Sequence, residues 1–334
     1  MQILNINDKQ KGAQIKIIAR IERAISNVGS NGLNYLILHL IDSTGRVEAR
    51  LWSASEENKQ ELIPDLIGEF TCIVNIYHNQ IQLKIENFKI FSADELKEKD
   101  ISIADFAISA PINSDKVIKK MQELFATFKN KTYKGVVLGV IEKYKKILTK
   151  FPAAISIHHN VISGLLWHST SLVEAARGLI SVYKYAEIDW ELVQIGAFLH
   201  DIGKIFEITS VNGSDYSLEG KLLGHISIGN AMIISVAKNR KLYYLDDEKN
   251  INPDFVLLQH VILSSHGKKD FGSPVEPNLI EAVIVSTLDN LDSRIYKIND
   301  ELKKVELNTW TSRLMTEDGK MFYKHLKNDT TKNG

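Results

Sequence analysis

The chain has 334 residues, 44% apolar and 25% charged, and a formal net charge of zero. This length suits two domains with ordinary cores, and the neutral balance means that any nucleic-acid surface must be a local patch. A single cysteine, Cys72, excludes an internal disulfide and favours a reducing compartment. The first twelve residues lack the apolar core of a signal peptide, and no apolar run approaches the ~18 residues of a membrane span. We therefore expect a soluble, cytoplasmic protein that spans no membrane.

Residues 12–92 have the pattern of a β domain. Apolar runs and polar/apolar alternation predict five strands, over Gln14–Ile21, Tyr35–Ile41, Arg46–Trp52, Phe70–Tyr77 and Gln80–Ile85. The turn Asp42-Ser-Thr-Gly45 joins the second strand to the third, and a short helix is expected over Glu56–Leu66. Five strands with one helix after the third fit a small Greek-key barrel of the oligonucleotide/oligosaccharide-binding (OB) type.

The rest of the chain is predicted to be all-α. The polar stretch Ser92–Asp100 precedes it, and Asn113 and Ser114 are the polar residues that cap a helix start. Helical periodicity predicts helices over 114–129, 132–149, 161–184, 189–202, 220–238, 252–264 and 278–298. We expect four regions: a barrel domain over 1–92, a polar linker with basic helices over 93–150, a helical bundle over 151–300 and an extension over 301–334.

A His-Asp pair, His200-Asp201, stands inside the apolar run Ile195–Lys204. A buried carboxylate without a partner is costly, and a divalent metal ion compensates it. Imidazole suits transition metals and carboxylate suits harder ions, so the pair is a mixed ligand set. The pair therefore predicts a metal site on this helix.

Two further residues extend this site. His168 ends the segment Gly164-Leu-Leu-Trp-His168, and Asp289 lies in a later apolar helix. The order His, His-Asp, Asp resembles the HD superfamily of metal-dependent phosphohydrolases over about residues 155–298. The resemblance implies that His168, His200, Asp201 and Asp289 bind one metal ion on a helical bundle.

More histidines fall where a second ion would need them. A pair of ions ~3.5–4 Å apart would hold a phosphate and activate a water. Asp201 would be the bridging carboxylate, with His225 and His266 completing the second site, while His260 is a ligand, a support for a ligand or a substrate contact. Lys204, four residues after His200 and on the same helix face, is a candidate phosphate contact. Asp292 is expected to form a cap or ion pair, or to support a ligand.

Several segments resemble the YhaM family of 3′→5′ exoribonucleases more closely, over about residues 10–300. In that family an N-terminal OB domain is joined to an HD domain. The matching segments are 42–52, 158–160 with 164–168, 220–229, 262–267 with 271–274, and 281–292. The resemblance implies a Mn²⁺- or Mg²⁺-dependent nuclease that releases nucleotides from the 3′ end of RNA, with single-stranded DNA as a further candidate substrate.

The chain departs from the family pattern at two positions. Trp167 stands where a Glu is expected before the helix histidine, and Ser265 stands where the first of two adjacent histidines is expected. The second departure leaves both one-ion and two-ion chemistry open. Mn²⁺ is the expected metal, and Mg²⁺, Co²⁺, Fe²⁺, Ni²⁺ and Zn²⁺ remain alternatives because a His/Asp site admits each of them to some degree.

Other residues are candidates for catalysis or substrate binding. Asp201 and Lys204 are expected to act at the scissile phosphate. His159, next to His158, would assist leaving-group protonation or substrate binding, unless it only packs at a helix start. The expected nucleic-acid contacts are stacking rings and cations at Tyr35, Arg46, Arg50, Trp52, Lys143 and Lys146.

The two expected basic helices are a further sign of nucleic-acid binding. Residues 113–150 hold ten lysines against three acidic residues, a net charge of +7 in an otherwise neutral chain. Such a run would attract a phosphate backbone, and it is equally compatible with an ordinary solvated surface.

Two other functions stay open. The first is an HD phosphohydrolase of small nucleotides or cyclic dinucleotides, although such a substrate needs no barrel that binds strands. The second is a single-strand-binding accessory protein with weakened catalysis, which Ser265 favours and the complete primary ligand set disfavours. The sequence leaves open the choice between RNA and DNA, the oligomeric state and the cellular targets.

Overall fold

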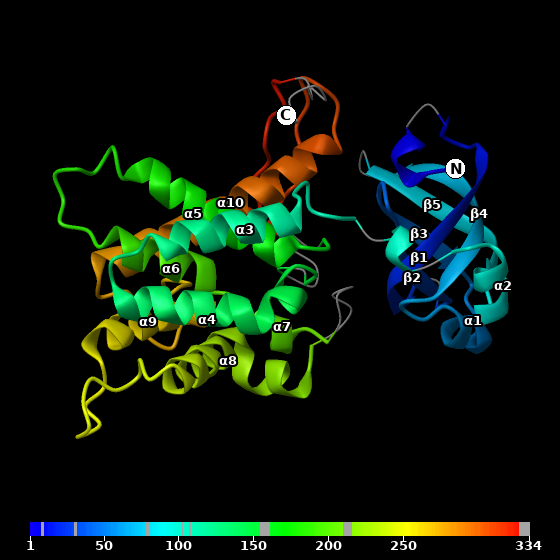
Figure 1. Cartoon of the computed structure of the whole chain (residues 1–334). Helices are drawn as coiled ribbons and strands as arrows, with labels where there is room; N and C mark the ends of the chain where they lie inside the picture. The colour runs from blue at the N-terminus through cyan, green and yellow to red at the C-terminus, as the bar shows by residue number, and fades with distance from the viewer. Residues whose placement is uncertain are drawn as a thin grey trace. The chain divides into compact units, whose positions relative to one another are not determined.

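The structure is a computed structural model that describes residues 1–7, 10–29, 32–77, 80–101, 103–106, 108–151, 153, 161–209 and 216–326. The chain folds as two compact units (Figure 1). The first combines Met1–Ile108 with Ile298–Gly334, and the second is Ser109–Lys297.

The first unit contains a closed barrel of five strands. These are β1 (Gln14–Val28), β2 (Asn34–Asp42), β3 (Gly45–Trp52), β4 (Ile67–Tyr77) and β5 (Gln80–Ile90). Their order around the barrel is β1-β2-β3-β5-β4, and β1 pairs with β4 to close it. Among the described strand pairs of the barrel, β3 and β5 are parallel and the other pairs are antiparallel. The predicted five-stranded barrel of OB type is confirmed.

The barrel core comes from the alternation of its strands. Ile15, Ile17, Ala19 and Ile21 point inward from β1 and are buried, because successive side chains point to opposite faces of a strand. Asp42 forms the predicted turn: its Oδ1 accepts hydrogen bonds from the backbone N–H groups of Thr44 and Gly45, at 2.7 and 3.0 Å.

Shorter elements complete this unit. Helix α1 (Glu56–Glu61) ends earlier than the expected Leu66, because Ile63 precedes Pro64 and is therefore disfavoured from helical dihedrals. The stretch expected to be a polar linker contains α2 (Ala93–Glu98), capped by a reciprocal Ser92–Glu95 pair of hydrogen bonds. Single 3₁₀ turns occupy η1 (Ile3–Asn5), η3 (Ile103–Phe106) and η5 (Met315–Glu317). Near the C-terminus, Trp310 pairs with Tyr323 in an antiparallel bridge.

The second unit is helical. Its helices are α3 (Ser114–Ala126), α4 (Lys131–Leu148), α5 (Gly164–Leu179), α6 (Trp190–Leu199), α7 (Lys204–Glu207), α8 (Leu218–Asn239), α9 (Pro253–Leu263) and α10 (Ile280–Lys303), with a 3₁₀ turn, η4 (Lys269–Phe271). The last helix, α10, continues to Lys303 in the first unit. Buried residues of α3, α4, α5, α6, α8, α9 and α10 share one apolar core. The expected all-α region is confirmed.

Two helix boundaries differ from the sequence prediction and matter for the site. The helix expected over 189–202 ends at Leu199, so His200 is its C-cap and Asp201 lies in the turn before α7. Helix α8 has a kink at Gly224, whose φ of 71° and ψ of 154° are not helical. Among the described residues, α8 alone is long and apolar enough to cross a membrane. The structure buries 39% of this apolar stretch, including Ile226, Ile233 and Val236.

Candidate metal centre

Two groups of His and Asp side chains meet in the helical unit. The first cluster is His168, His200 and Asp289, and the second cluster is Asp201, His225 and His266. Within each cluster the ligand atoms lie within 4.8 Å of one another. The structure thus brings together six of the seven side chains expected to bind metal.

The first cluster is built from α5, the end of α6 and α10. His168 Nε2 lies 3.2 Å from His200 Nε2 and 3.2 Å from Asp289 Oδ1. Both histidines are 0% exposed. Their other ring nitrogens are occupied, since His168 Nδ1 lies 2.7 Å from Asp292 Oδ2 and His200 Nδ1 lies 2.9 Å from the carbonyl oxygen of Ala197. These contacts turn both Nε2 atoms toward the cluster.

The second cluster is more open to solvent. His225 Nε2 lies 3.4 Å from His266 Nε2 and 3.3 Å from Asp201 Oδ1. The His225 and His266 side chains are 16% and 21% exposed. His225 Nδ1 lies 3.0 Å from Glu207 Oε1. The two histidines of the second cluster are therefore nearer to solvent than those of the first.

Asp201 connects the two clusters. Its Oδ2 lies 3.3 Å from His200 Nε2, while its Oδ1 faces His225. Lys204 is buried, and its Nζ donates a hydrogen bond of 2.7 Å to Asp201 Oδ2. Asp289 also spans the gap, since its Oδ2 lies 4.0 Å from His266 Nε2.

The donor set fits divalent metal ions. Ligand atoms that share one ion at ~2.1 Å lie about 3.0–3.4 Å apart. The Nε2–Nε2 separations of 3.2 and 3.4 Å match this value in both clusters. Asp201 Oδ1 is buried and accepts no hydrogen bond from the described residues, which is a costly arrangement that a cation would relieve. The residues that would hold the ions are thus those of the two clusters.

The charges of the site favour cation binding. Burial raises the pKa values of Asp201 and Asp289, but their neighbours outweigh it: the charges of His200 and Lys204 at Asp201, and the hydrogen bonds from His168 and His200 at Asp289. Both carboxyl groups therefore titrate well below their usual range. Burial lowers the pKa of His200, but the Asp201 carboxylate outweighs it and raises this pKa to about 10. Without an ion, a proton on the imidazole therefore balances the carboxylate charge.

Close backbone packing sets the position of His225. A Cβ on Gly203 would lie 2.6 Å from the backbone N of Gly229 and closer still to the carbonyl oxygen of His225. Only glycine at 203 allows α8 to lie directly against the turn that carries Asp201. The positive φ of Gly224 kinks the backbone of α8 immediately before His225.

One expected metal ligand lies apart from the clusters, and one expected catalytic residue is not among the described residues. His260 is on α9 and belongs to neither cluster, and its Nε2 accepts a hydrogen bond of 2.9 Å from the backbone N–H of Asn278. His159 lies outside the described residues. Ser265 is buried, and its hydroxyl has no hydrogen-bond partner within the part of the chain that the structure describes. Sequence reasoning missed Glu207, because an isolated Glu after Lys204 carries no local signal of a contact with a histidine on α8.

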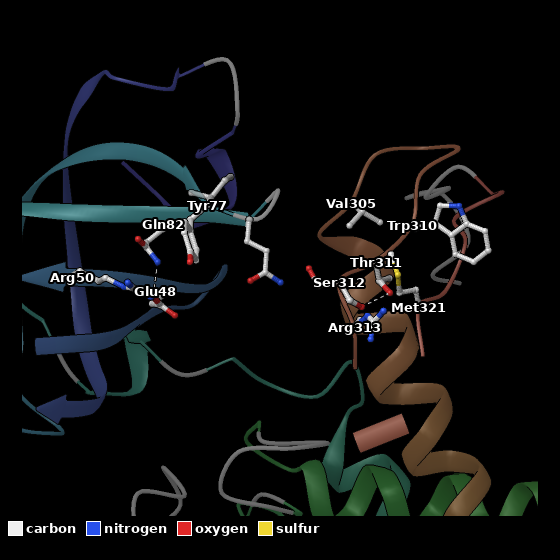
Figure 2. A pocket seen from close by; sticks show the side chains of 12 residues that line it. Glu48, Arg50, Tyr77, Gln82, Val305, Trp310, Thr311, Ser312, Arg313 and Met321 are labelled. Carbon is white, nitrogen blue, oxygen red and sulfur yellow. Dashed lines mark hydrogen bonds and ion pairs between the residues drawn. The ribbon is translucent and has the colours of Figure 1, made fainter. Parts of the chain in front are cut away.

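The barrel carries a separate aromatic surface. Tyr35 and Trp52 face each other across β2 and β3 and stack at 4.8 Å between ring centres. The Arg50 guanidinium lies 5.7–5.9 Å from the ring centres of Tyr35, Trp52 and Tyr77. Its Nε donates to Glu48, which also accepts a hydrogen bond from Gln82 (Figure 2).

The other expected nucleic-acid contacts are placed differently. Arg46 is paired with Glu22, since its Nε donates to both carboxylate oxygens at 2.9 and 3.0 Å. Lys143 and Lys146 are exposed on α4 in the helical unit.

The fold and the site define a class of protein. A helical domain that presents ordered His, His-Asp and Asp ligands is of the HD type, and the family model described as "HD domain" matches residues 165–294. The chain is 32% identical over 315 residues to the "3′-5′ exoribonuclease YhaM" of Geobacillus sp. (strain WCH70), covering 94% of this chain and 93% of the relative. It is also 32% identical over 313 residues to the protein of that name from Bacillus licheniformis, covering 94% of this chain and 95% of the relative. The chain belongs to the YhaM 3′-5′ exoribonuclease family.

Among solved structures, the second OB-fold domain of replication protein A from Methanococcus maripaludis is similar to part of the chain. The identity is 20% and the TM-score 0.23, and the match covers 28% of this chain and 94% of that one.

Proposed function

We propose that this chain is a metal-dependent 3′→5′ exoribonuclease that hydrolyses phosphodiester bonds of single-stranded RNA. The observation that carries the proposal is the pair of His/Asp clusters joined by Asp201. Two relatives named 3′-5′ exoribonuclease, similar over 94% of the chain, support the direction and the substrate class.

The proposed ligand set has two halves. His168, His200, Asp201 and Asp289 would hold the first ion, and Asp201, His225 and His266 the second. Bound divalent ions would lower the pKa of a water and offset the charge that develops on the phosphate. Mn²⁺ is the metal we propose, because the donors mix imidazole with carboxylate, and Mg²⁺, Co²⁺, Fe²⁺, Ni²⁺ and Zn²⁺ are the alternatives to test.

Lys204 is proposed to attract the scissile phosphate. Burial lowers its pKa, but the neighbouring Asp201 carboxylate outweighs burial and raises it, so the ammonium stays charged at neutral pH. The Asp201 contact of 2.7 Å holds this ammonium at the edge of both clusters. A phosphate that approaches the clusters would therefore meet a fixed positive charge.

The barrel is proposed to bind the single strand mainly by stacking. Residues 1–108 hold twelve Lys and Arg against fifteen Asp and Glu, so this part of the chain is net negative and offers little general attraction for phosphate. Trp52 and Tyr77 are 46% and 53% exposed and present their rings to solvent. Bases would stack on these rings, while Lys143 and Lys146 would contact the phosphates.

We also propose a cytoplasmic location.

The test is a gel assay on a 5′-labelled single-stranded RNA with Mn²⁺. We expect a ladder that shortens from the 3′ end, is abolished by EDTA and by Asp201→Asn, and is unchanged by Asp247→Asn, a substitution of an exposed acid remote from the clusters in sequence. A circular RNA of the same sequence should stay intact. Cleavage of the circle would refute the exonuclease assignment, and binding without cleavage would favour a strand-binding accessory protein. The same DNA sequence measures the preference for RNA.

A further inference from the structure

A buried carboxylate beside the second cluster has no role in the proposed reaction. Glu207 is the last residue of α7 and is 8% exposed. Its Oε1 lies 3.0 Å from His225 Nδ1 and also accepts a hydrogen bond of 3.0 Å from the backbone N–H of His225. One oxygen atom thus contacts both the ring and the main chain of the same histidine.

Two glycines of α8 make this double contact feasible. A Cβ on Gly220 would lie 2.9 Å from Glu207 Cγ and closer still to the Glu207 backbone, so the first turn of α8 packs directly on Glu207. Gly224 adopts a positive φ that L-residues rarely adopt. The backbone N–H of the next residue, His225, donates a hydrogen bond to the Glu207 carboxylate. The backbone around Glu207 is therefore built for this contact.

We propose that Glu207 is the positioning residue of the second cluster and determines whether a second metal ion binds. By accepting from Nδ1–H, the carboxylate selects the tautomer of His225 whose Nε2 carries the free lone pair. That Nε2 points to Asp201 Oδ1 at 3.3 Å. This inference rests on the proposed function only in taking the second cluster to be a metal site.

The first cluster does not depend on Glu207. Its two histidines are held by Asp292 and by the carbonyl oxygen of Ala197. Loss of the Glu207 carboxylate should therefore weaken the second ion alone. A residue with a merely structural role would change stability without separating the two ions.

The experiment measures Mn²⁺ bound by the full-length protein, by equilibrium dialysis and by the electron paramagnetic resonance signal of coupled Mn²⁺ pairs. The wild type should bind two ions. Glu207→Ala should keep the first ion with unchanged affinity and bind the second about 10–100-fold more weakly. Glu207→Gln keeps an oxygen that accepts both hydrogen bonds, whereas Glu207→Asp keeps the charge but is too short to reach both donors.

If Glu207 acts by positioning His225, the Gln variant should bind the second ion more tightly than the Asp variant. This order can be measured even if the Ala variant does not fold. The opposite order, or two ions bound normally by all three variants, would overturn the inference. A wild type that binds only one ion and still degrades RNA would also overturn it while leaving the proposed function in place. No metal-dependent cleavage at all would refute the proposed function itself.

Discussion

Replacing Gly203 with alanine tests whether backbone packing assembles the second cluster. A Cβ at this position would lie 2.6 Å from Gly229 N and closer to the carbonyl oxygen of His225. Because both atoms belong to the backbone, neither can rotate away. The Gly229 contact alone requires α8 to retreat by ~0.8 Å, and the tighter contact with the carbonyl oxygen requires a larger shift. The 3.3 Å between His225 Nε2 and Asp201 Oδ1 would then exceed ~4 Å, beyond the ~3.0–3.4 Å of two ligands on one ion.

We expect Gly203→Ala to lose the second ion, to reduce RNA cleavage about 100-fold and to destabilise the protein by about 1–3 kcal/mol. Metal content, gel assays and thermal unfolding measure the three effects. The matched control is Gly178→Ala on the exposed face of α5, where an added Cβ meets nothing within 4 Å. This control should keep both ions and gain about 0.4–1 kcal/mol. Normal binding of two ions by Gly203→Ala would refute the packing argument.

Four further predictions address the metal, the stability of the metal-free protein and the nucleic acid. The pKa of His200 is raised to about 10 and a ligand imidazole must be neutral, so Mn²⁺ affinity should rise up to tenfold per pH unit between pH ~6.5 and ~9.5 in titration calorimetry. In that window the metal-free protein should lose stability as the pH rises, because the folded-state pKa lies above the unfolded value of ~6.5. Trp52→Ala should weaken binding of a short single-stranded RNA by about 1–3 kcal/mol in fluorescence anisotropy with EDTA, and an unchanged affinity would argue against stacking on the barrel. Lys143→Gln and Lys146→Gln should each reduce the slope of log affinity against log salt by about 0.7, and an unchanged slope would remove these lysines from the interface.

The barrel could be predicted because its signal is local. Alternation such as Ile15, Ile17, Ala19 and Ile21 records which face of a strand is buried, and Asp42 marks a turn by its side-chain hydrogen bonds. Helix ends were harder, since the end of α6 at Leu199 depends on contacts with remote helices. Helix α2 lies in the stretch expected to be a polar linker, although its Ser92–Glu95 capping pair is a local sequence signal of a helix start.

The metal ligands could be predicted in part. His168, His200, Asp201 and Asp289 stand in an ordered motif, which needs no knowledge of distances. The contact between Glu207 and His225 could not be predicted, because it depends on the conformation of Gly224 and on close packing between α7 and α8. His260 was ambiguous in sequence, and its contact with the amide of Asn278 becomes visible only in three dimensions.

The spread of the ligands along the chain has a consequence for biosynthesis. His168 is on α5 and Asp289 is on α10, so the first cluster is incomplete until nearly the whole helical unit has left the ribosome. The barrel strands all precede them and can close much earlier. A nascent or truncated chain would therefore have a folded barrel before it has a complete set of metal ligands. In a nuclease of this design, the barrel can therefore fold before α10, and with it the last ligand of the hydrolytic centre, has been synthesised.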